Sequence, residues 1–219
     1  MLSNYFSTLG MEQITRIHDA SLTVLQKTGI RVGHPLALEK LDAAGAQVDS
    51  ASKRVCLPPQ MVEDAVVQTP KTFLCAGRSP EYDFTVGNGS SPLPVFRTVG
   101  GPIHYFDSKV GQARPICAKD CADIAHLVDA LDHLNILATL TPQDIPQKTY
   151  DIEILKVDLE NSRKHIWALT TDSKNLKYQL EMMVAIAGGS RQLQHRPVCS
   201  GIVCLIDPLY FPDDEILFP

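Results

Sequence analysis

Val95-Phe-Arg-Thr-Val-Gly100 and Asn135-Ile-Leu-Ala-Thr-Leu-Thr141 are the first two of four apolar runs that decide the fold. The other two are His165-Ile-Trp-Ala-Leu-Thr170 and Pro197-Val-Cys-Ser-Gly-Ile-Val-Cys-Leu205. Each run is apolar almost throughout and does not alternate, which is typical of strands covered on both faces. The segments between the runs are long enough for a crossover helix, which parallel strands require. The pattern therefore predicts a parallel sheet with helices outside it.

Three amphipathic helices are predicted between these runs. In the first, the apolar stripe at helical spacing consists of Ile124, Leu127, Val128 and Leu131. In the second, the stripe consists of Ile152, Leu155 and Leu159, and the residues expected in solvent are Asp151, Glu153, Lys156, Asp158 and Glu160. The third begins at Asp172 or Ser173, which are good N-caps, and ends at Gly188-Gly189. A hairpin of residues 103–106 and 112–116 is expected before the first helix.

The N-terminal third has helical patterns without the repeated alternation of strand and helix. Helices are predicted from Met11 to Gly29, from Pro35 to Gly45, and after Pro58. Short strand-like pieces are expected at residues 54–57 and 72–76. We therefore predict a helical extension over residues 1–91 and the first half of a barrel over residues 92–219.

The composition is that of an ordinary globular protein. Hydrophobic residues make up 44% of the chain and the formal net charge is -5, with no basic run that would favour nucleic acid. No apolar stretch is long enough to span a membrane, and no signal peptide pattern opens the chain. The six cysteines are scattered and predict no disulfide framework. We expect a cytoplasmic protein that binds neither nucleic acid nor membrane.

Candidate site residues follow from the predicted parallel sheet, because ligands of such folds bind beyond the carboxyl ends of the strands. The residues at these places are Thr98, Gly100, Gly101, Thr141, Asp144, Thr170 and Asp207. Small and hydroxyl-bearing residues dominate, as suits a pocket in which a compact ligand approaches the backbone. Each of them also has a plainer interpretation as a turn residue. No catalytic nucleophile is visible.

Metal and phosphate motifs are not evident. Cys117 and Cys121 are one helical turn apart, but neither a Cys-x-x-Cys nor a His-Glu-x-x-His pattern accompanies them. The glycines around residues 87–89 and 100–101 lack the spacing of a nucleotide-binding loop. His165 begins a strand at the end opposite the expected site, so we interpret it as structural. We expect no bound metal.

Several segments together resemble the trimethylamine methyltransferase family, which includes enzymes that demethylate glycine betaine. They include Ile17-His-Asp-Ala-Ser-Leu-Thr-Val-Leu-Gln-Lys-Thr-Gly-Ile-Arg-Val32, Leu41-Asp-Ala-Ala-Gly-Ala-Gln-Val-Asp49 and Leu127-Val-Asp-Ala-Leu-Asp132. The resemblance implies a TIM (β/α)8 barrel with an N-terminal helical extension. It also implies transfer of a methyl group from a methylated amine to a corrinoid that a partner protein carries, with no cofactor bound directly by this chain.

Only about four strands fit into this chain, so the resemblance covers the first half of such a barrel. We expect the segment to be inactive by itself, to lack the later region where trimethylamine enzymes carry pyrrolysine, and to form a homo-oligomer. Two alternatives stay open. The chain could be an inactive truncated paralogue that acts as an oligomeric scaffold or binding module, or it could come from an unrelated barrel enzyme of small-molecule metabolism.

Overall fold

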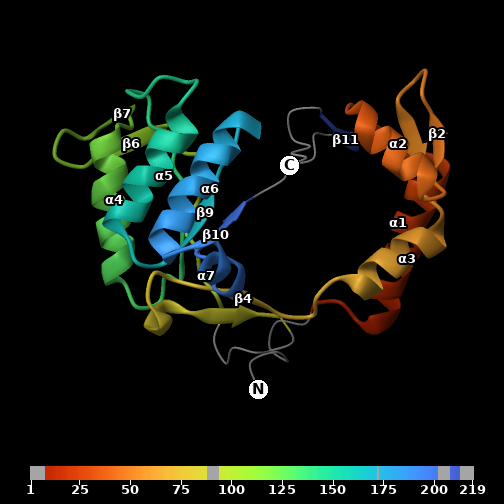
Figure 1. Cartoon of the computed structure of the whole chain (residues 1–219), viewed down its shortest axis with the longest axis horizontal. Helices are drawn as coiled ribbons and strands as arrows, with labels where there is room; N and C mark the ends of the chain where they lie inside the picture. The colour runs from red at the N-terminus through yellow and green to blue at the C-terminus, as the bar shows by residue number, and fades with distance from the viewer. Residues whose placement is uncertain (1–7, 88–93, 172, 202–207, 213–219) are drawn as a thin grey trace. The chain divides into compact units, whose positions relative to one another are not determined.

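A computed structural model describes residues 8–87, 94–171, 173–201 and 208–212 (Figure 1). The chain is a mixed α/β protein with several small sheets. It divides into two compact units, of which the first comprises Met1–Pro70 with Val203–Phe218 and the second comprises Lys71–Ile202 with Pro219. The predicted boundary at residues 91 and 92 falls outside the described residues and stays a prediction. None of the helices in the described ranges is long and apolar enough to cross a membrane.

The first unit contains three helices and a four-stranded sheet. Its elements are α1 (Met11–Lys27), β1 (Ile30–Val32), α2 (Pro35–Ala43), β2 (Gln47–Asp49), β3 (Arg54–Cys56), α3 (Pro59–Gln68) and β11 (Tyr210–Phe211). The strand order is β11-β1-β3-β2, with β11 parallel to β1 and the other neighbours antiparallel. The three predicted helices and the strand at residues 54–57 are confirmed, whereas β1, β2 and β11 were not predicted.

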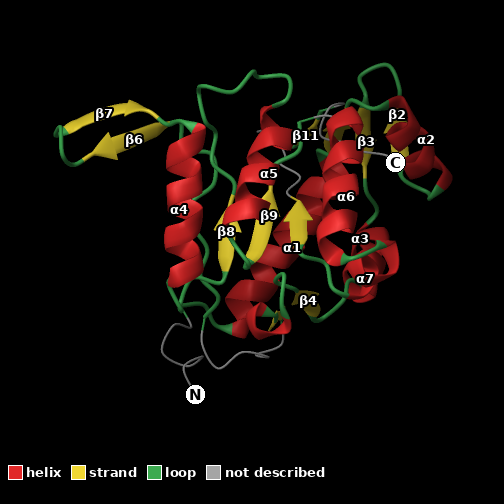
Figure 2. Cartoon of the chain, turned by 60° about the vertical axis from the view of Figure 1, so that its left-hand side comes forward, coloured by secondary structure: helices red, strands yellow, loops and turns green. Residues whose placement is uncertain are grey.

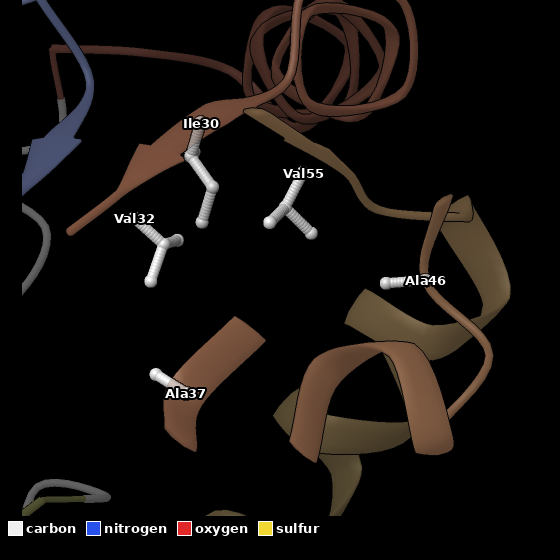
Figure 3. Packing of buried hydrophobic residues seen from close by; sticks show 5 residues of the cluster. All are labelled: Ile30, Val32, Ala37, Ala46 and Val55. Carbon is white, nitrogen blue, oxygen red and sulfur yellow. The ribbon is translucent and has the colours of Figure 1, made fainter. Parts of the chain in front are cut away.

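The core of the first unit lies between this sheet and the helices. Figure 3 shows the side chains of Ile30, Val32, Ala37, Ala46 and Val55 gathered there, and Val55 is fully buried. The turn from α1 into β1 passes close to β3, because a Cβ atom at Gly29 would lie 2.4 Å from the Val55 carbonyl oxygen. Gly29 also has φ +70°, so the turn requires glycine both for its conformation and for space.

The second unit is built around three parallel strands. Its elements are β4 (Phe73–Cys75), a 3-10 turn (Pro80–Tyr82), β5 (Phe84–Val86), β6 (His104–Asp107), β7 (Gln112–Pro115), α4 (Ala118–Ala130), β8 (Ile136–Ala138), α5 (Tyr150–Asn161), β9 (His165–Ala168), α6 (Ser173–Ala187), α7 (Ser190–His195) and β10 (Cys199–Gly201). The parallel sheet has the order β10-β9-β8. The predicted hairpin is confirmed as β6 and β7, which pair antiparallel.

The first predicted run, residues 95–100, forms a single parallel bridge between Arg97 and Ile136 and no regular strand. Side chains replace some of the backbone hydrogen bonds that would join two regular strands there. The Thr98 hydroxyl accepts a hydrogen bond from the Ala138 backbone N–H, and the Asn135 side chain accepts one from the Phe96 N–H. The prediction of a fourth strand was therefore wrong within the described residues, although this segment does run parallel beside β8.

Helices α4, α5 and α6 lie in a row on one face of the parallel sheet (Figures 1 and 2). Leu155 and Leu159 of α5 pack with Ile166 of β9 and with Met183 of α6. In α4 the buried face consists of Cys121, Ala125 and Val128, whereas Leu127 and Leu131 of the predicted stripe are exposed. The prediction was right for Val128, which is buried, and for Ile124, which packs against it, and wrong for Leu127 and Leu131, because Cys121 and Ala125 occupy the rest of the inner face.

Candidate functional site

Three of the predicted site residues lie together beside the end of β8. The Thr98 hydroxyl accepts from the Ala138 N–H at 2.8 Å, and the Gly101 N–H donates to the Thr139 carbonyl at 3.1 Å. A Cβ atom at Gly100 would lie 3.4 Å from the Ala138 Cβ atom, so a larger residue would crowd β8. These three positions fasten the segment to the sheet, and they bring their backbone close to the end of the strand as predicted.

Thr141 and Asp144 lie in the loop after β8. The Thr141 N–H donates to the Pro102 carbonyl at 3.3 Å. The Asp144 carboxylate accepts a hydrogen bond of 2.9 Å from the N–H of Ala118, the first residue of α4. The first N–H groups of a helix have no partner within the helix, so this contact stabilises the start of α4.

We expect Asp144→Ala to lower the free energy of unfolding by about 1 kcal/mol, the usual loss when a helix cap is removed. Asp144→Asn should lose less, because an amide oxygen accepts the same hydrogen bond. Urea unfolding of the three proteins, followed by circular dichroism, measures both differences. Equal stability of the alanine variant and the natural chain would show that the contact with Ala118 contributes nothing.

Thr170 belongs to a buried polar network that sequence analysis missed. Its hydroxyl donates to the Gln179 side-chain oxygen at 2.7 Å, and the Gln179 amide donates to the backbone carbonyls of Asp151 and Leu169. Gln179 and Asp151 are both fully buried. The prediction that Asp151 lies in solvent was wrong, because its carboxylate accepts hydrogen bonds from Thr171 at the end of β9.

Asp158, also predicted to lie in solvent, is buried as well. It lies on the face of α5 that packs on the sheet, and its carboxyl accepts a hydrogen bond of 3.0 Å from the Thr139 hydroxyl just after β8. Burial raises the pKa of Asp158 to about 7, and the Thr139 hydrogen bond opposes that shift. Burial also raises the pKa values of the Cys121 and Cys199 thiols to about 12, and the neighbouring Asp158 charge adds to both shifts.

On the face of the parallel sheet opposite the helices, an arginine side chain is stacked on a tryptophan ring. Ile166 and Ala168 pack against the helices. Because side chains alternate along a strand, Trp167 lies on the opposite face. The guanidinium carbon of Arg97 lies 3.7 Å from the centroid of the Trp167 ring. This distance is well within the range of a cation–π interaction, so this face of Trp167 is already used to hold an organic cation.

His165 is held inside the second unit, as its structural interpretation requires. It is 1% exposed, its two ring nitrogens contact the Ala76 carbonyl and the Ser200 hydroxyl, and burial lowers its pKa. Asp207, the last of the predicted site residues, lies outside the described residues. Within the described ranges, no three His, Cys, Asp or Glu side chains are arranged to hold a metal ion.

Thr98, Thr141 and Thr170 lie at the carboxyl ends of β8 and β9 or beside them. The Thr98 hydroxyl bonds to β8 and the Thr170 hydroxyl bonds to Gln179 of α6, so these two polar groups do not converge on one cavity. Trp167 and Arg97 were not predicted as site residues. An aromatic residue in a strand otherwise rich in aliphatic residues was the signal that could have drawn attention to them.

Parallel strands joined by crossover helices define an α/β protein, the class in which ligand sites lie beyond the carboxyl ends of the strands. More particularly, the chain belongs to the trimethylamine methyltransferase family. The model of this family, described as Trimethylamine methyltransferase (MTTB), matches residues 3–217. The resemblance seen in the sequence is thereby confirmed.

Several curated relatives support this assignment. A trimethylamine methyltransferase MttB of Desulfitobacterium hafniense (strain DSM 10664 / DCB-2) is 32% identical over 199 residues, which are 90% of this chain and 40% of the relative. A glycine betaine methyltransferase of Desulfitobacterium hafniense (strain Y51) is 25% identical over 97% of this chain and 43% of its own length. An MttB of Methanosarcina barkeri (strain Fusaro / DSM 804) is 27% identical over 94% of this chain and 42% of its own length. The chain thus spans about two fifths of the length of these relatives.

Proposed function

We propose that this chain is the N-terminal part of an enzyme that transfers a methyl group from a methylated amine to a corrinoid carried by a partner protein. The relatives named above are methyltransferases of trimethylamine and of glycine betaine. Both compounds offer methyl groups on a nitrogen that is positively charged at neutral pH. The corrinoid supplies the group that accepts the methyl, and this chain's part is to bind and orient the amine.

The observation that carries the proposal is the position of Arg97 over Trp167. An indole face that holds a guanidinium at 3.7 Å has the electrostatics to hold a methylated ammonium group in its place. Trp167 lies next to Ala138 across β8 and next to Ser200 across β10, so small side chains flank the ring on both sides. We propose that the amine displaces Arg97 from the ring.

The barrel architecture is part of the same proposal. Residues 95–100, β8, β9 and β10 lie side by side in chain order and run parallel, with a crossover helix after β8 and another after β9. This arrangement supports the first half of a (β/α)8 barrel, whose ligand sites lie at the carboxyl ends of the strands. Phe96 and Val99 are exposed beside this sheet. We propose that self-association covers them, so the chain acts as an oligomer.

The single tryptophan of the chain makes the amine site directly measurable. We expect trimethylamine or glycine betaine to change the Trp167 fluorescence in a saturable way, because either cation would replace the guanidinium. Arg97→Gln removes the competing cation and should tighten binding about fivefold, in line with a cation–π contribution near 1 kcal/mol.

Arg31→Gln is the matched control, because Arg31 is stacked on Tyr210 and its loss changes the charge equally. It should leave the titration unchanged. tert-Butanol, a neutral molecule of similar shape, should produce no saturable change, and an equal response to it would refute recognition of the charge. Because we expect this segment to be inactive by itself, loss of methyl groups from trimethylamine in the presence of reduced cobalamin, measured with a longer protein that contains this segment, would distinguish the enzyme from the scaffold alternative.

A further inference from the structure

A cleft of about 420 Å³ lies where α6 ends and α7 leads into β10. Its polar lining consists of Arg78, Arg191, Gln192, His195 and Arg196, and apolar residues form the rest of the wall. Figure 1 shows α7 next to β10, and in the chain it lies between the end of α6 and the start of that strand. The cleft therefore lies at the amino ends of the strands, away from the residues proposed to bind the amine.

Two of the arginines are fixed in place by the fold. Arg78 donates from Nη1 to the Leu159 carbonyl at 2.7 Å. Arg196 donates to the two carboxylate oxygens of Asp83 from Nε and Nη2, at 3.0 and 2.7 Å. Such contacts hold the planar guanidinium groups in position before any ligand arrives, so little ordering is needed on binding.

Two other side chains that can donate hydrogen bonds into the cleft are Arg191 and His195. Within the described residues, neither the Arg191 nor the His195 side chain has a hydrogen-bond or ion-pair partner, and the two lie one turn apart on α7. Among the residues that the structure describes, no acidic side chain lines the cleft, although the chain carries a net charge of -5. Near the end of α6, the carbonyls of Ala185 and Val184 already accept hydrogen bonds from the N–H groups of Gly188 and Gly189.

We propose that this cleft binds the phosphate group of a small phosphorylated metabolite. One guanidinium group can donate two parallel hydrogen bonds to two oxygens of a phosphate. Three arginine side chains line this site. The volume lies in the range of small-molecule sites, roughly 300–1,000 Å³. Ile186 and Val198 offer an apolar surface to the organic part of the ligand. The assignment does not depend on amine binding, since it uses other residues at the other end of the strands.

Isothermal titration calorimetry of the 219-residue chain with inorganic pyrophosphate tests the proposal. We expect saturable binding of one pyrophosphate per chain. Arg191→Gln should weaken it about tenfold, because a charge-assisted contact is lost, and His195→Gln should weaken it by a smaller factor. Lys177→Gln is the matched control, since it removes one positive charge from α6 outside the cleft, and it should change the affinity less than twofold.

Three results would overturn the proposal. They are the absence of saturable binding, an equal loss of affinity in Arg191→Gln and Lys177→Gln, and binding of citrate as tight as that of pyrophosphate. The last would show a site for polyanions in general without preference for phosphate. Both Arg191 and His195 are exposed, so these variants should keep the fold, which circular dichroism checks.

Discussion

Asp151→Ala is expected to lower the free energy of unfolding by about 3–5 kcal/mol, because it breaks a buried network of hydrogen bonds. The carboxylate accepts four of them, from the backbone N–H groups of Ile152 and Thr171, the Thr171 hydroxyl and the Asn175 amide, at 2.7 to 3.0 Å. Asp151 thereby joins the start of α5 to the end of β9 and the start of α6. Alanine would leave these donors buried without their acceptor.

Urea unfolding followed by circular dichroism measures this loss. Glu160→Ala removes a carboxylate from the exposed side of the same helix, where its ion pair with Lys156 is in solvent, and should cost less than about 0.5 kcal/mol. Asp151→Asn keeps the shape but replaces one acceptor oxygen with an amide that cannot accept these hydrogen bonds, so its loss should fall between the two. A loss for Asp151→Ala similar to that for Glu160→Ala would show that the network adds little to stability.

The elements that could be predicted from the sequence are those with both a periodic apolar pattern and clear end signals. Helix α3, for example, lies between Pro58 and Pro70, and β9 is one continuous apolar run. Strands β1 and β2 have three residues each, which is too few for an alternating pattern to be recognised. Helix α7 carries one apolar residue, Leu193, in six, so its helical spacing cannot be seen in the sequence.

The sequence predicted where the candidate site residues lie but not the direction of their side chains. Parallel strands place their carboxyl ends at one edge, which correctly brings Thr98, Gly100 and Gly101 beside the end of β8. The direction of a side chain depends on partners that are distant in the sequence. When only apolar residues are used to find the buried face of a helix, every carboxylate is expected to lie in solvent. Asp151 and Asp158 were misplaced for this reason, since their partners come from loops after strands.

The stacking of Arg97 on Trp167 could not be predicted for the same reason, because it depends on residues that are distant in the sequence. The two residues belong to different apolar runs, and the parallel bridge between Arg97 and Ile136, with the hydrogen bonds beside it, sets the register that brings the guanidinium over the ring. Trp167 stands out in its own strand as an aromatic residue, but nothing in its segment indicates that Arg97 is its partner. The sequence therefore indicates at which end of the sheet a ligand would bind but not which side chains would hold it.

Asp158→Asn is expected to change the pH dependence of stability more than any other single substitution proposed for this chain. Burial raises the pKa of this carboxyl to about 7, whereas an aspartate in an unfolded chain titrates at about 4. Between these values the folded chain keeps a proton that the unfolded chain has released. The free energy of unfolding therefore falls as the pH rises from about 4 to about 7, by a total on the order of 4 kcal/mol.

Asparagine cannot ionise, yet its side-chain oxygen can still accept the hydrogen bond from Thr139. The variant should match the natural chain near pH 4 and be several kcal/mol more stable at pH 8, which urea unfolding at successive pH values measures. The lowered pKa of His165 makes the free energy of unfolding rise with pH. This effect is the same in both proteins, so it cancels in the difference between them. Asp123→Asn, on the exposed side of α4, should give a curve parallel to that of the natural chain. If the advantage of Asp158→Asn is the same at pH 4.5 and pH 8, Asp158 is not the group that holds the proton.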